Sequence, residues 1–271
     1  MSSQPDTSTA DSAVHLPVID WCPITTEGKV TIKPERGSGS HEITVQPFEI
    51  ARFPITARQF RAFKHPDTGY RNVDRRWWTW AGQTGSKHWT QPETIFADQA
   101  NCPVTGVNWF NAVAFCNWLT YHSRLKGSLD DAHVIRLPTE AEWQCAAVGF
   151  DGTYDPPHRY PWGAKWDEEH LRANTSECSL HDVIAVGMFP GDNHLVSYSG
   201  AEDLFGNVAE WCLSCFNSPK ETNLGDDVER AVRGAHFNVK GADHSALEWR
   251  RGHKPSTSER WLGFRVVRGL A

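Results

Sequence analysis

Two carboxylates and two backbone carbonyls can alternate around a glycine turn between Asp203 and Glu210. The carbonyls are those of Gly206 and Val208, so one loop can offer four oxygen ligands. Calcium prefers a shell of hard oxygen atoms, and a long loop without regular structure needs this kind of support. We therefore predict that Asp203, Gly206, Val208 and Glu210 bind calcium. The alternative is that Glu210 caps a turn or pairs with an arginine.

The seven cysteines are an odd number at irregular spacing, which argues against a framework of disulfides. Cys212 and Cys215 form one C-x-x-C pair, but neither a second pair nor a nearby histidine cluster completes a zinc site. No βαβ pattern suggests thioredoxin chemistry. We therefore expect reduced thiols, with these two as small half-buried residues after Trp211.

Three histidines, His236, His244 and His253, lie in the closing part of the chain. They share no helical or strand register, and histidines scattered in loops are more often solvated than bound to a metal. The sequence also lacks a nucleophile elbow that could place a serine for attack. These residues therefore predict neither a substitute metal site nor a catalytic triad.

Three segments carry the signals of helices. Residues 56–63 and 139–148 each begin with a capping box, in which a threonine stands three positions before a Gln or Glu. The third segment, from Asn108 to about Leu125, places apolar residues on one face at helical spacing. We predict a helix in each of them.

Strand signals are short and few. Residues 42–45, 48–51 and 264–267 have β-rich composition bounded by turn residues, whereas residues 151–238 show almost no periodicity. The chain also contains 13 tryptophans and 21 glycines. We therefore expect a loop-rich fold whose core is filled by aromatic rings reaching inward from irregular segments.

Length and charge limit the possible functions. A chain of 271 residues with 39% hydrophobic and 22% charged residues is typical of a soluble protein with one main domain. The net charge is -6, and the charged residues form no long run of one sign. We therefore expect neither nucleic acid nor a membrane surface as a partner. No apolar stretch is long enough to span a bilayer, and the polar start does not look like a leader peptide. We expect a cytoplasmic location.

The composition changes near residue 40. Residues 1–40 are rich in Ser, Thr and Pro, and we expect an N-terminal extension that is partly disordered up to about Ala13. Residues 41–271 then form the single domain.

Six blocks of this domain, in order, resemble the formylglycine-generating enzyme family, also called the sulfatase-modifying factor family. Six ordered blocks rarely match by chance, and together they span about residues 41 to 268. They are residues 41–50 (HEITVQPFEI) followed by 54–60 (PITARQF), then 103–109 (PVTGVNW), 136–143 (RLPTEAEW), 160–163 (YPWG), 206–211 (GNVAEW) and 263–265 (GFR).

The resemblance implies a fold and two metal sites. The fold is α+β and C-type-lectin-like, loop-rich, with a small antiparallel sheet and two main helices. Family members bind calcium at positions that match Asp203, Gly206, Val208 and Glu210. A second calcium site is implied at Asn174, the carbonyl of Thr175, Asp182 and the carbonyl of Ile184, although Asn and Asp in loops also make Asx turns.

The closing segment departs from the enzymes of this family. The resemblance implies that those enzymes oxidise a substrate cysteine with oxygen and hold Cu(I) through two thiolates of the closing segment. Soft thiolates have no good substitute among other side chains. The matching positions fall near Val239 and His244, and no cysteine lies beyond Cys215. We therefore expect no copper and no oxidase activity, so the chain is not expected to be an enzyme of that kind.

Between Arg233-Gly234 and Gly263-Phe264-Arg265 the chain mixes aromatic, cationic, anionic and small residues, as binding loops of antibodies do. This segment is similar to that of the variable proteins of diversity-generating retroelements, a subset of the family in which a lectin-like scaffold holds mutable ligand-contacting positions. The resemblance is partial, because the common Gly-Gly-Ser-Trp opening is Gly-Ala-His-Phe here. Diversification would produce such departures, and drift in an ordinary family member would produce similar ones. The expected ligand-binding residues, within a variable segment 235–262, are His236, Phe237, Asn238, Lys240, Asp243, His244, Glu248, Trp249, Arg251, His253, Lys254, Ser256, Ser258, Arg260 and Trp261.

Several residues in or next to the closing segment also have a structural interpretation. Trp249, Trp261 and Phe264 can equally belong to the core, and Arg250 and Arg265 are expected to brace carbonyls or carboxylates. The run from Arg75 to Trp80 can form a cation-π wall, although ordinary packing of an inserted loop is the simpler interpretation.

The sequence thus favours a non-catalytic, calcium-stabilised binding protein whose ligand is a protein or another molecule. An enzyme or enzyme accessory of the same family, using chemistry other than the copper-cysteine oxidase, is the alternative. A structural role in a larger assembly also stays open.

Overall fold

The computed structural model describes most of the chain from Val14 to Leu270. The predicted disorder up to Ala13 lies outside the described residues, as do Arg75 and part of the closing segment. The described ranges are 14–33, 39–65, 68–70, 76–80, 83–84, 99–167, 170–189, 197–222, 227–241 and 249–270.

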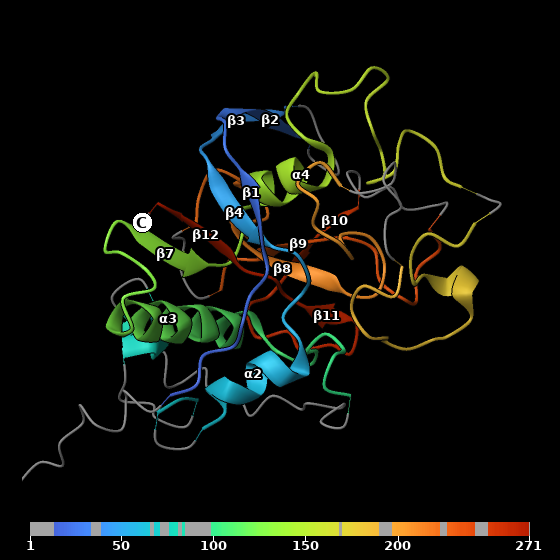
Figure 1. Ribbon diagram of the computed structural model, residues 1–271. Coiled ribbons are helices and arrows are strands. Elements are labelled where there is room, and N and C mark those ends of the chain that lie inside the picture. The colour runs from blue at the N-terminus through green and yellow to red at the C-terminus, as the bar shows by residue number, and fades with distance from the viewer. Residues whose placement is uncertain are drawn as a thin grey trace, which may run out of the picture.

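Two four-stranded sheets form the centre of the fold (Figure 1). The first is antiparallel throughout, in the order β1-β4-β12-β7. The second has the order β10-β9-β8-β11, and only its β8–β11 pair is parallel. Their strands are β1 (Trp21–Ile24), β4 (Phe48–Ala51), β7 (His133–Arg136), β8 (Ala209–Cys215), β9 (Arg230–Arg233), β10 (Arg250–His253), β11 (Leu262–Gly263) and β12 (Val267–Leu270).

Two smaller sheets complete the β-structure. In one, β2 pairs with β3 antiparallel, and in the other β5 pairs with β6. Short 3-10 turns, η1 and η3, lie in the loops. These elements are β2 (Gly28–Ile32), β3 (His41–Val45), β5 (Thr79–Trp80), β6 (Gln83–Thr84), η1 (Arg76–Trp78) and η3 (Ser176–Cys178).

The three predicted helices are confirmed as α2 (Ala57–Phe63), α3 (Trp109–Leu125) and α4 (Glu140–Val148). Thr56 and Thr139 both form complete capping boxes. Each hydroxyl accepts a bond from the backbone amide three residues later, and the side-chain oxygen of that residue accepts one from the threonine backbone amide. In Figure 1 the central strands lie between α4 on one side and α3 with α2 on the other. No helix in the described ranges has both the length and the apolar composition needed to cross a membrane.

The folded domain begins earlier than the boundary expected near residue 40. Strand β1 pairs with β4, and β2 pairs with β3, so residues 21–32 belong to the sheets. The Ser, Thr and Pro content that suggested an extension did not reveal these strands, because Val30 and Ile32 become apolar core only when β3 and α4 cover them.

The predicted strand 264–267 is wrong as a single element. Strand β11 ends at Gly263 and β12 begins at Val267, and the intervening residues cross from one sheet to the other. Their carbonyls still accept bonds: the Phe264 oxygen accepts one from the Ile55 amide (2.9 Å), and the Val266 oxygen accepts one from the Ala51 amide (2.9 Å). The β-rich composition reflects burial on all sides, not continuous strand pairing.

Strands β8 and β9 lie inside the region where the sequence showed almost no periodicity. All their side chains are buried except that of Leu213, which is half-buried. A strand covered on both faces has no alternation of polar and apolar residues, so its period of two is invisible. Cys212 and Cys215, on β8, are accordingly fully buried free thiols and not the half-buried residues expected.

The core is rich in aromatic rings, as predicted. Phe264 meets Phe60 and Phe115 edge to face, with ring centroids 6.2 and 5.5 Å apart. Trp77 and Trp78 are both buried, against α3 and Tyr70, so the packing interpretation of the Arg75 to Trp80 run is confirmed for these two rings.

Candidate functional site

The closing segment returns to the scaffold through one buried ion pair, between Arg265 and Glu210. The Arg265 Nε and Nη2 atoms donate to the two Glu210 oxygens, each at 2.7 Å. Both side chains are fully buried, and the Trp143 indole nitrogen on α4 donates to the same carboxylate at 2.9 Å. The structure therefore shows the arginine partner that the sequence left as the alternative for Glu210.

Arg265 uses all five of its N–H donors in this arrangement. Beside the two bonds to Glu210, Nη1 donates to the carbonyls of Ala51 and Arg52, each at 3.1 Å, and Nη2 donates to the carbonyl of Glu202 at 2.8 Å. One side chain thus joins β4, β8 and the loop that carries Asp203. The expected bracing role of Arg265 is confirmed.

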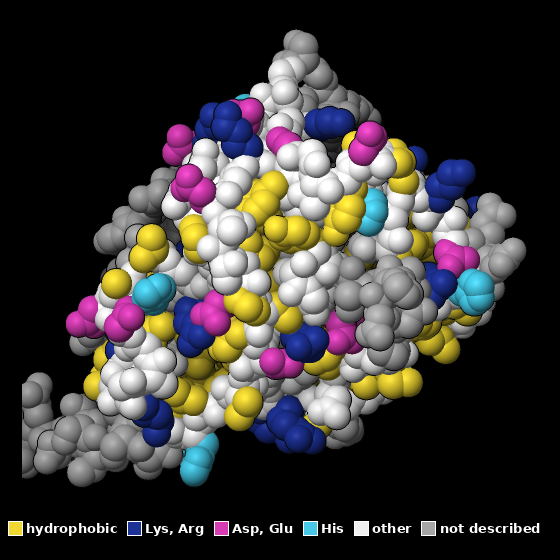
Figure 2. Space-filling model, turned by 45° about the horizontal axis from the view of Figure 1, so that its top comes forward, with side chains coloured by type: hydrophobic (Ala, Val, Ile, Leu, Met, Phe, Trp, Pro, Cys, Tyr) yellow, Lys and Arg dark blue, Asp and Glu magenta, His cyan; other side chains and the backbone are white. Residues whose placement is uncertain are grey.

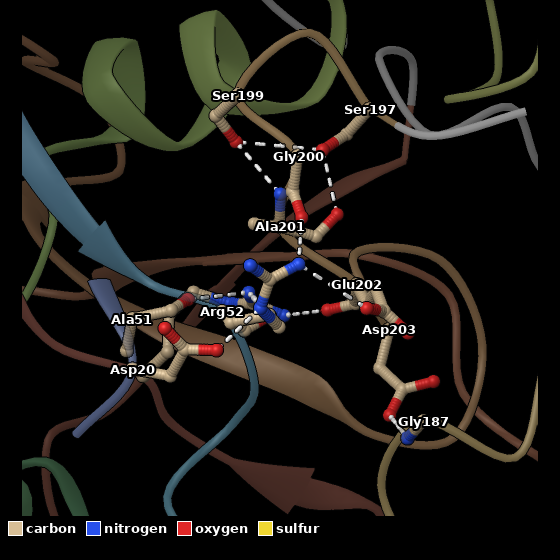
Figure 3. Close-up of polar contacts among 11 residues, drawn as sticks. Asp20, Ala51, Arg52, Gly187, Ser197, Ser199, Gly200, Ala201, Glu202 and Asp203 are labelled. Carbon is tan, nitrogen blue, oxygen red and sulfur yellow. Dashed lines mark hydrogen bonds and ion pairs between the residues drawn. The ribbon is translucent and has the colours of Figure 1, made fainter. Parts of the chain in front are cut away.

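Asp203 lies next to this centre but takes no part in it. Its backbone is in the left-handed region, with φ 54°, and its Oδ2 accepts a bond from the Gly187 amide at 2.9 Å. Figure 3 shows its carboxylate directed towards Gly187, while Glu202 faces Arg52. Burial raises the pKa of Asp203 to about 6, and the Gly187 bond and Arg265 only partly offset that effect.

Glu210 does not fit its expected role in the first calcium site. Its negative charge is already neutralised by Arg265, and a calcium ion beside it would face a buried guanidinium. The shell predicted at Asp203, Gly206, Val208 and Glu210 would then retain one uncompensated charge, that of Asp203. Hard cations are held mainly by such charged oxygens, so this set is a weak calcium site.

The second expected set fits a cation better. The Asn174 amide nitrogen donates to the Asp182 carbonyl at 2.8 Å, which leaves Asn174 Oδ1 buried with no hydrogen-bond partner. Asn207 donates to the Ile184 carbonyl at 3.1 Å and so places Ile184 beside Asn174. An orphaned buried oxygen costs about 1–3 kcal/mol unless an ion or water meets it.

Asp182 can supply the charge that this second set needs. Its carboxylate is 38% exposed and its ion pair with Arg260 is long, at 3.3 Å. Exposed pairs of this kind contribute about 0–1 kcal/mol, so a cation can replace the arginine. Within the described residues no group of three or more His, Cys, Asp and Glu side chains gathers, so any such site depends on amide and backbone oxygens.

A second buried ionic group fixes the start of the closing segment. Glu140, at the first turn of α4, accepts bonds from Arg233 (2.9 Å) and from Arg250 (2.6 and 2.8 Å). Burial raises the pKa of Glu140, but the two guanidiniums outweigh it and hold that pKa below its usual range. The pair Arg233 and Arg250 lies side by side in β9 and β10, so Glu140 clamps both strands. The bracing role expected of Arg250 is confirmed.

The structure divides the predicted ligand-binding residues by exposure. Three of them, Asp243, His244 and Glu248, lie outside the described residues. Three more, Arg251, His253 and Trp261, are half-buried. The exposed ones, called here the six exposed positions, are Asn238, Lys240, Lys254, Ser256, Ser258 and Arg260.

His236, Phe237 and Trp249 are corrections, because all three are buried. Their exposed fractions are 7%, 2% and 5%. His236 stacks on Trp261, with ring centroids 4.5 Å apart, and meets Trp249 edge to face at 5.8 Å. Phe237 packs with Val208 under the same ring. These side chains support the surface from below and do not form it.

Main-chain atoms hold the first half of the closing segment in place. The carbonyls of Ala235 and Val239 accept bonds from Gly206 (3.1 Å) and Ser176 (3.0 Å). The Gly241 amide donates to the Glu177 carboxylate at 2.8 Å.

The second half is held in the same way. The carbonyls of Pro255, Glu259 and Trp261 accept bonds from the amides of Trp109 (3.0 Å), Gly106 (3.0 Å) and Ala209 (2.9 Å). Because these bonds use backbone atoms of the closing segment, they survive most changes of its side chains.

Sequence reasoning missed the partners of these charges. Glu140 looked like an ordinary acidic residue in a capped first turn, and Trp143 like an ordinary core ring. Asn207 stands between the two carbonyls predicted to bind calcium, and an asparagine beside a glycine is a signal for the left-handed region, where it lies with φ 63°.

Arg265→Lys is predicted to lower the free energy of unfolding by about 3 kcal/mol, because lysine cannot supply five fixed donors and leaves buried acceptors unpaired. Urea unfolding of the purified variant measures this. Arg268→Lys is the matched control, since Arg268 pairs with Glu49 at a half-exposed site, and it should cost less than about 1 kcal/mol. Equal losses in both variants would show that the buried network has no special weight.

Alanine at all six exposed positions is predicted to change the free energy of unfolding by less than about 2 kcal/mol, because substitutions of surface side chains are usually small. Phe237→Ala alone should cost about 3–5 kcal/mol, since it empties a filled core position. Urea unfolding compares the two. A larger loss in the sixfold variant would mean that these side chains are structural.

Comparison with known proteins agrees with this fold. The Sulfatase-modifying factor enzyme 1-like domain matches residues 22–270. A mouse relative (Mus musculus), the inactive C-alpha-formylglycine-generating enzyme 2, is 28% identical over 267 residues, covering 84% of this chain and 77% of the relative. The hercynine oxygenase of Mycolicibacterium thermoresistibile is 33% identical over 259 residues, covering 84% of this chain and 52% of the relative.

Among solved structures, the Treponema denticola variable protein 1 has the same fold. Its TM-score is 0.60 at 19% sequence identity, with 91% of this chain and 94% of that chain covered. The predicted α+β, C-type-lectin-like and loop-rich architecture is confirmed. The chain belongs to the family of Sulfatase-modifying factor enzyme 1-like domains, that of the formylglycine-generating enzymes.

Proposed function

We propose that this protein is a non-catalytic binding protein whose lectin-like scaffold presents the closing segment to a protein or other ligand. The observation that carries the proposal is the division within that segment. Its backbone and buried side chains are bonded to the scaffold, while the six exposed positions face solvent. Such an arrangement lets the exposed side chains change while the fold is kept, as in antibody loops.

Thiol chemistry is poorly supported. No cysteine lies beyond Cys215, so the closing segment lacks the pair of thiolates that the resemblance to the family's oxidases implies as copper ligands. Burial raises the pKa of Cys145 to about 12 and that of Cys212 well above the ordinary thiol range. Both thiols are protonated at neutral pH and are poor nucleophiles. One relative is itself named an inactive enzyme.

The fold shared with a variable protein supports a more specific proposal. In this proposal residues 235–262 are diversified, as in the variable proteins of diversity-generating retroelements. On the face drawn in Figure 2, acidic and basic side chains are interspersed and do not form one patch of a single sign. The face drawn in Figure 2 therefore offers no continuous positive surface for nucleic acid or an anionic membrane.

An enzyme of the same family is the second candidate. The 33% identity to a hercynine oxygenase favours it, although this chain spans about half the length of that relative. This candidate would use chemistry other than the copper-cysteine oxidase, and an oxygen-uptake assay with a cysteine peptide tests that oxidase activity separately. Clear turnover would overturn the non-catalytic proposal.

Sequencing the gene and its flanks from several isolates tests diversification. We expect dense substitutions confined to residues 235–262 and concentrated at the six exposed positions, with buried Phe237 and Trp249 kept. A near-copy of the region and a reverse transcriptase should lie beside the gene. Uniform divergence along the gene, or changes equally frequent at buried positions, would contradict the proposal.

Calcium is proposed to brace the scaffold at Asn174 and Asp182. Adding calcium to chelator-treated protein should raise the melting temperature, because an ion that binds only the native state stabilises it. Asp182→Asn should abolish the rise, and Asp203→Asn should keep it. Unchanged melting and no bound metal in the wild type would refute the proposal, and loss of the rise in Asp203→Asn alone would move the site to Asp203.

The Asp203 variant has a second expected effect. In the wild type the pKa of Asp203 is raised to about 6. The protonated carboxyl therefore stabilises the fold fully below its unfolded pKa near 4, and this stabilisation is lost as the pH rises through 6. In chelator at pH 7.5, Asp203→Asn should therefore be more stable than the wild type by about 1–2 kcal/mol, and at pH 4 the difference should vanish.

A further inference from the structure

A cavity of about 720 Å³ lies between α3 and β7, away from the closing segment. Small-molecule sites typically have about 300–1,000 Å³. Its walls come from three elements, and none of its described lining residues belongs to residues 235–262. The apolar part is formed by Val113, Tyr121 and Leu125 of α3, Val134 and Ile135 of β7, and Leu213 of β8.

This cavity exposes apolar side chains that the core covers only in part. Leu125, at the end of α3, is 56% exposed, and Val134 and Leu213 are half-buried. Leu213 is the one residue of β8 that the fold leaves partly uncovered. A contiguous apolar surface of this kind on a soluble protein is often a binding site.

Two arginines line the cavity, and only one of them lacks a close counter-charge. Arg136 makes a bidentate pair with Glu142, with both bonds at 2.7 Å. Arg124 instead donates to three backbone carbonyls, of which that of His133 is nearest at 2.7 Å. Among the described residues its nearest carboxylate is that of Asp131, 3.9 Å away on a fully exposed side chain.

Arg124 is therefore a positive charge, 33% exposed and weakly compensated, at the edge of an apolar cavity. Two uncharged polar side chains of the lining are already bonded: the Thr120 hydroxyl exchanges bonds with the Ile135 backbone, each at 2.9 Å, and the Asn117 amide donates to the Trp77 carbonyl at 3.0 Å. Asp131 also lines the cavity, but its carboxylate is fully exposed and 3.9 Å from Arg124, so an anion bound inside the cavity can still pair with this guanidinium. A carboxylate meets a guanidinium with charge-assisted bonds of about twice the usual strength.

We propose that this cavity binds a small apolar carboxylic acid, with its hydrocarbon part against Leu125, Val134 and Leu213 and its carboxylate on Arg124. The ligand class follows from the apolar walls together with a single weakly compensated cation. The site is separate from the closing segment and does not depend on the function proposed for it.

Isothermal titration of the full chain with octanoate, octan-1-ol and octylamine tests the ligand class. Octanoate should bind about tenfold more tightly than octanol, and octylamine most weakly. Val134→Trp should abolish octanoate binding by filling the cavity. The control is Leu171→Trp, which adds the same ring at an exposed position (55%) outside the cavity, and it should leave binding unchanged.

Arg124→Gln should reduce octanoate affinity to that of octanol, and Arg124→Lys should restore most of the difference. Circular dichroism and melting of each variant confirm that it is folded. Equal binding of the three ligands, no octanoate binding at millimolar concentration, or full binding by Val134→Trp would overturn the proposal. A second overturning result would be a wild-type protein that is a dimer and does not bind octanoate, and that Val134→Trp converts to a monomer. A second copy of the chain would then fill the cavity.

Discussion

The buried pair of Arg265 and Glu210 is the interaction on which the rest of the structure depends. A guanidinium removed from water is costly unless every donor is bonded, and here five bonds collect β4, β8 and the Glu202 carbonyl around one residue. The geometry of the Asp203 loop follows from this centre. The same pair neutralises Glu210, which is why the first predicted calcium site, at Asp203 to Glu210, fits a cation less well than the second predicted site, at Asn174 and Asp182.

The second ionic group, Glu140 with Arg233 and Arg250, separates scaffold from surface. It clamps β9 to β10 at the point where the closing segment leaves and re-enters the sheet. Between these anchors the segment is held by its own carbonyls and by buried rings such as Phe237. Backbone bonds are indifferent to most side chains, so the exposed positions carry little of the stability, and a binding function can change there without loss of the fold.

Much of the helical structure could be predicted because its signals are local. The capping boxes at Thr56 and Thr139 involve residues three positions apart, and both are present as expected. Strands β8 and β9 were not predicted, because burial on both faces hides their period. Strands β1 and β2 were not predicted either, because they lie in a part of the chain whose Ser, Thr and Pro content indicated an extension. The bracing roles of Arg250 and Arg265 were expected from the family resemblance, but their carboxylate partners were not.

The sequence by itself determined the family, the α+β class, the order of the blocks and the lack of any cysteine beyond Cys215, since these are properties of residue identity and spacing. Tertiary structure decided which side chains of the closing segment reach solvent, that Glu210 pairs with Arg265, and that an oxygen of Asn174 lacks a partner. It also formed the cavity between α3 and β7. Burial and ion pairing join residues that lie tens to hundreds of positions apart, so no local pattern can specify them.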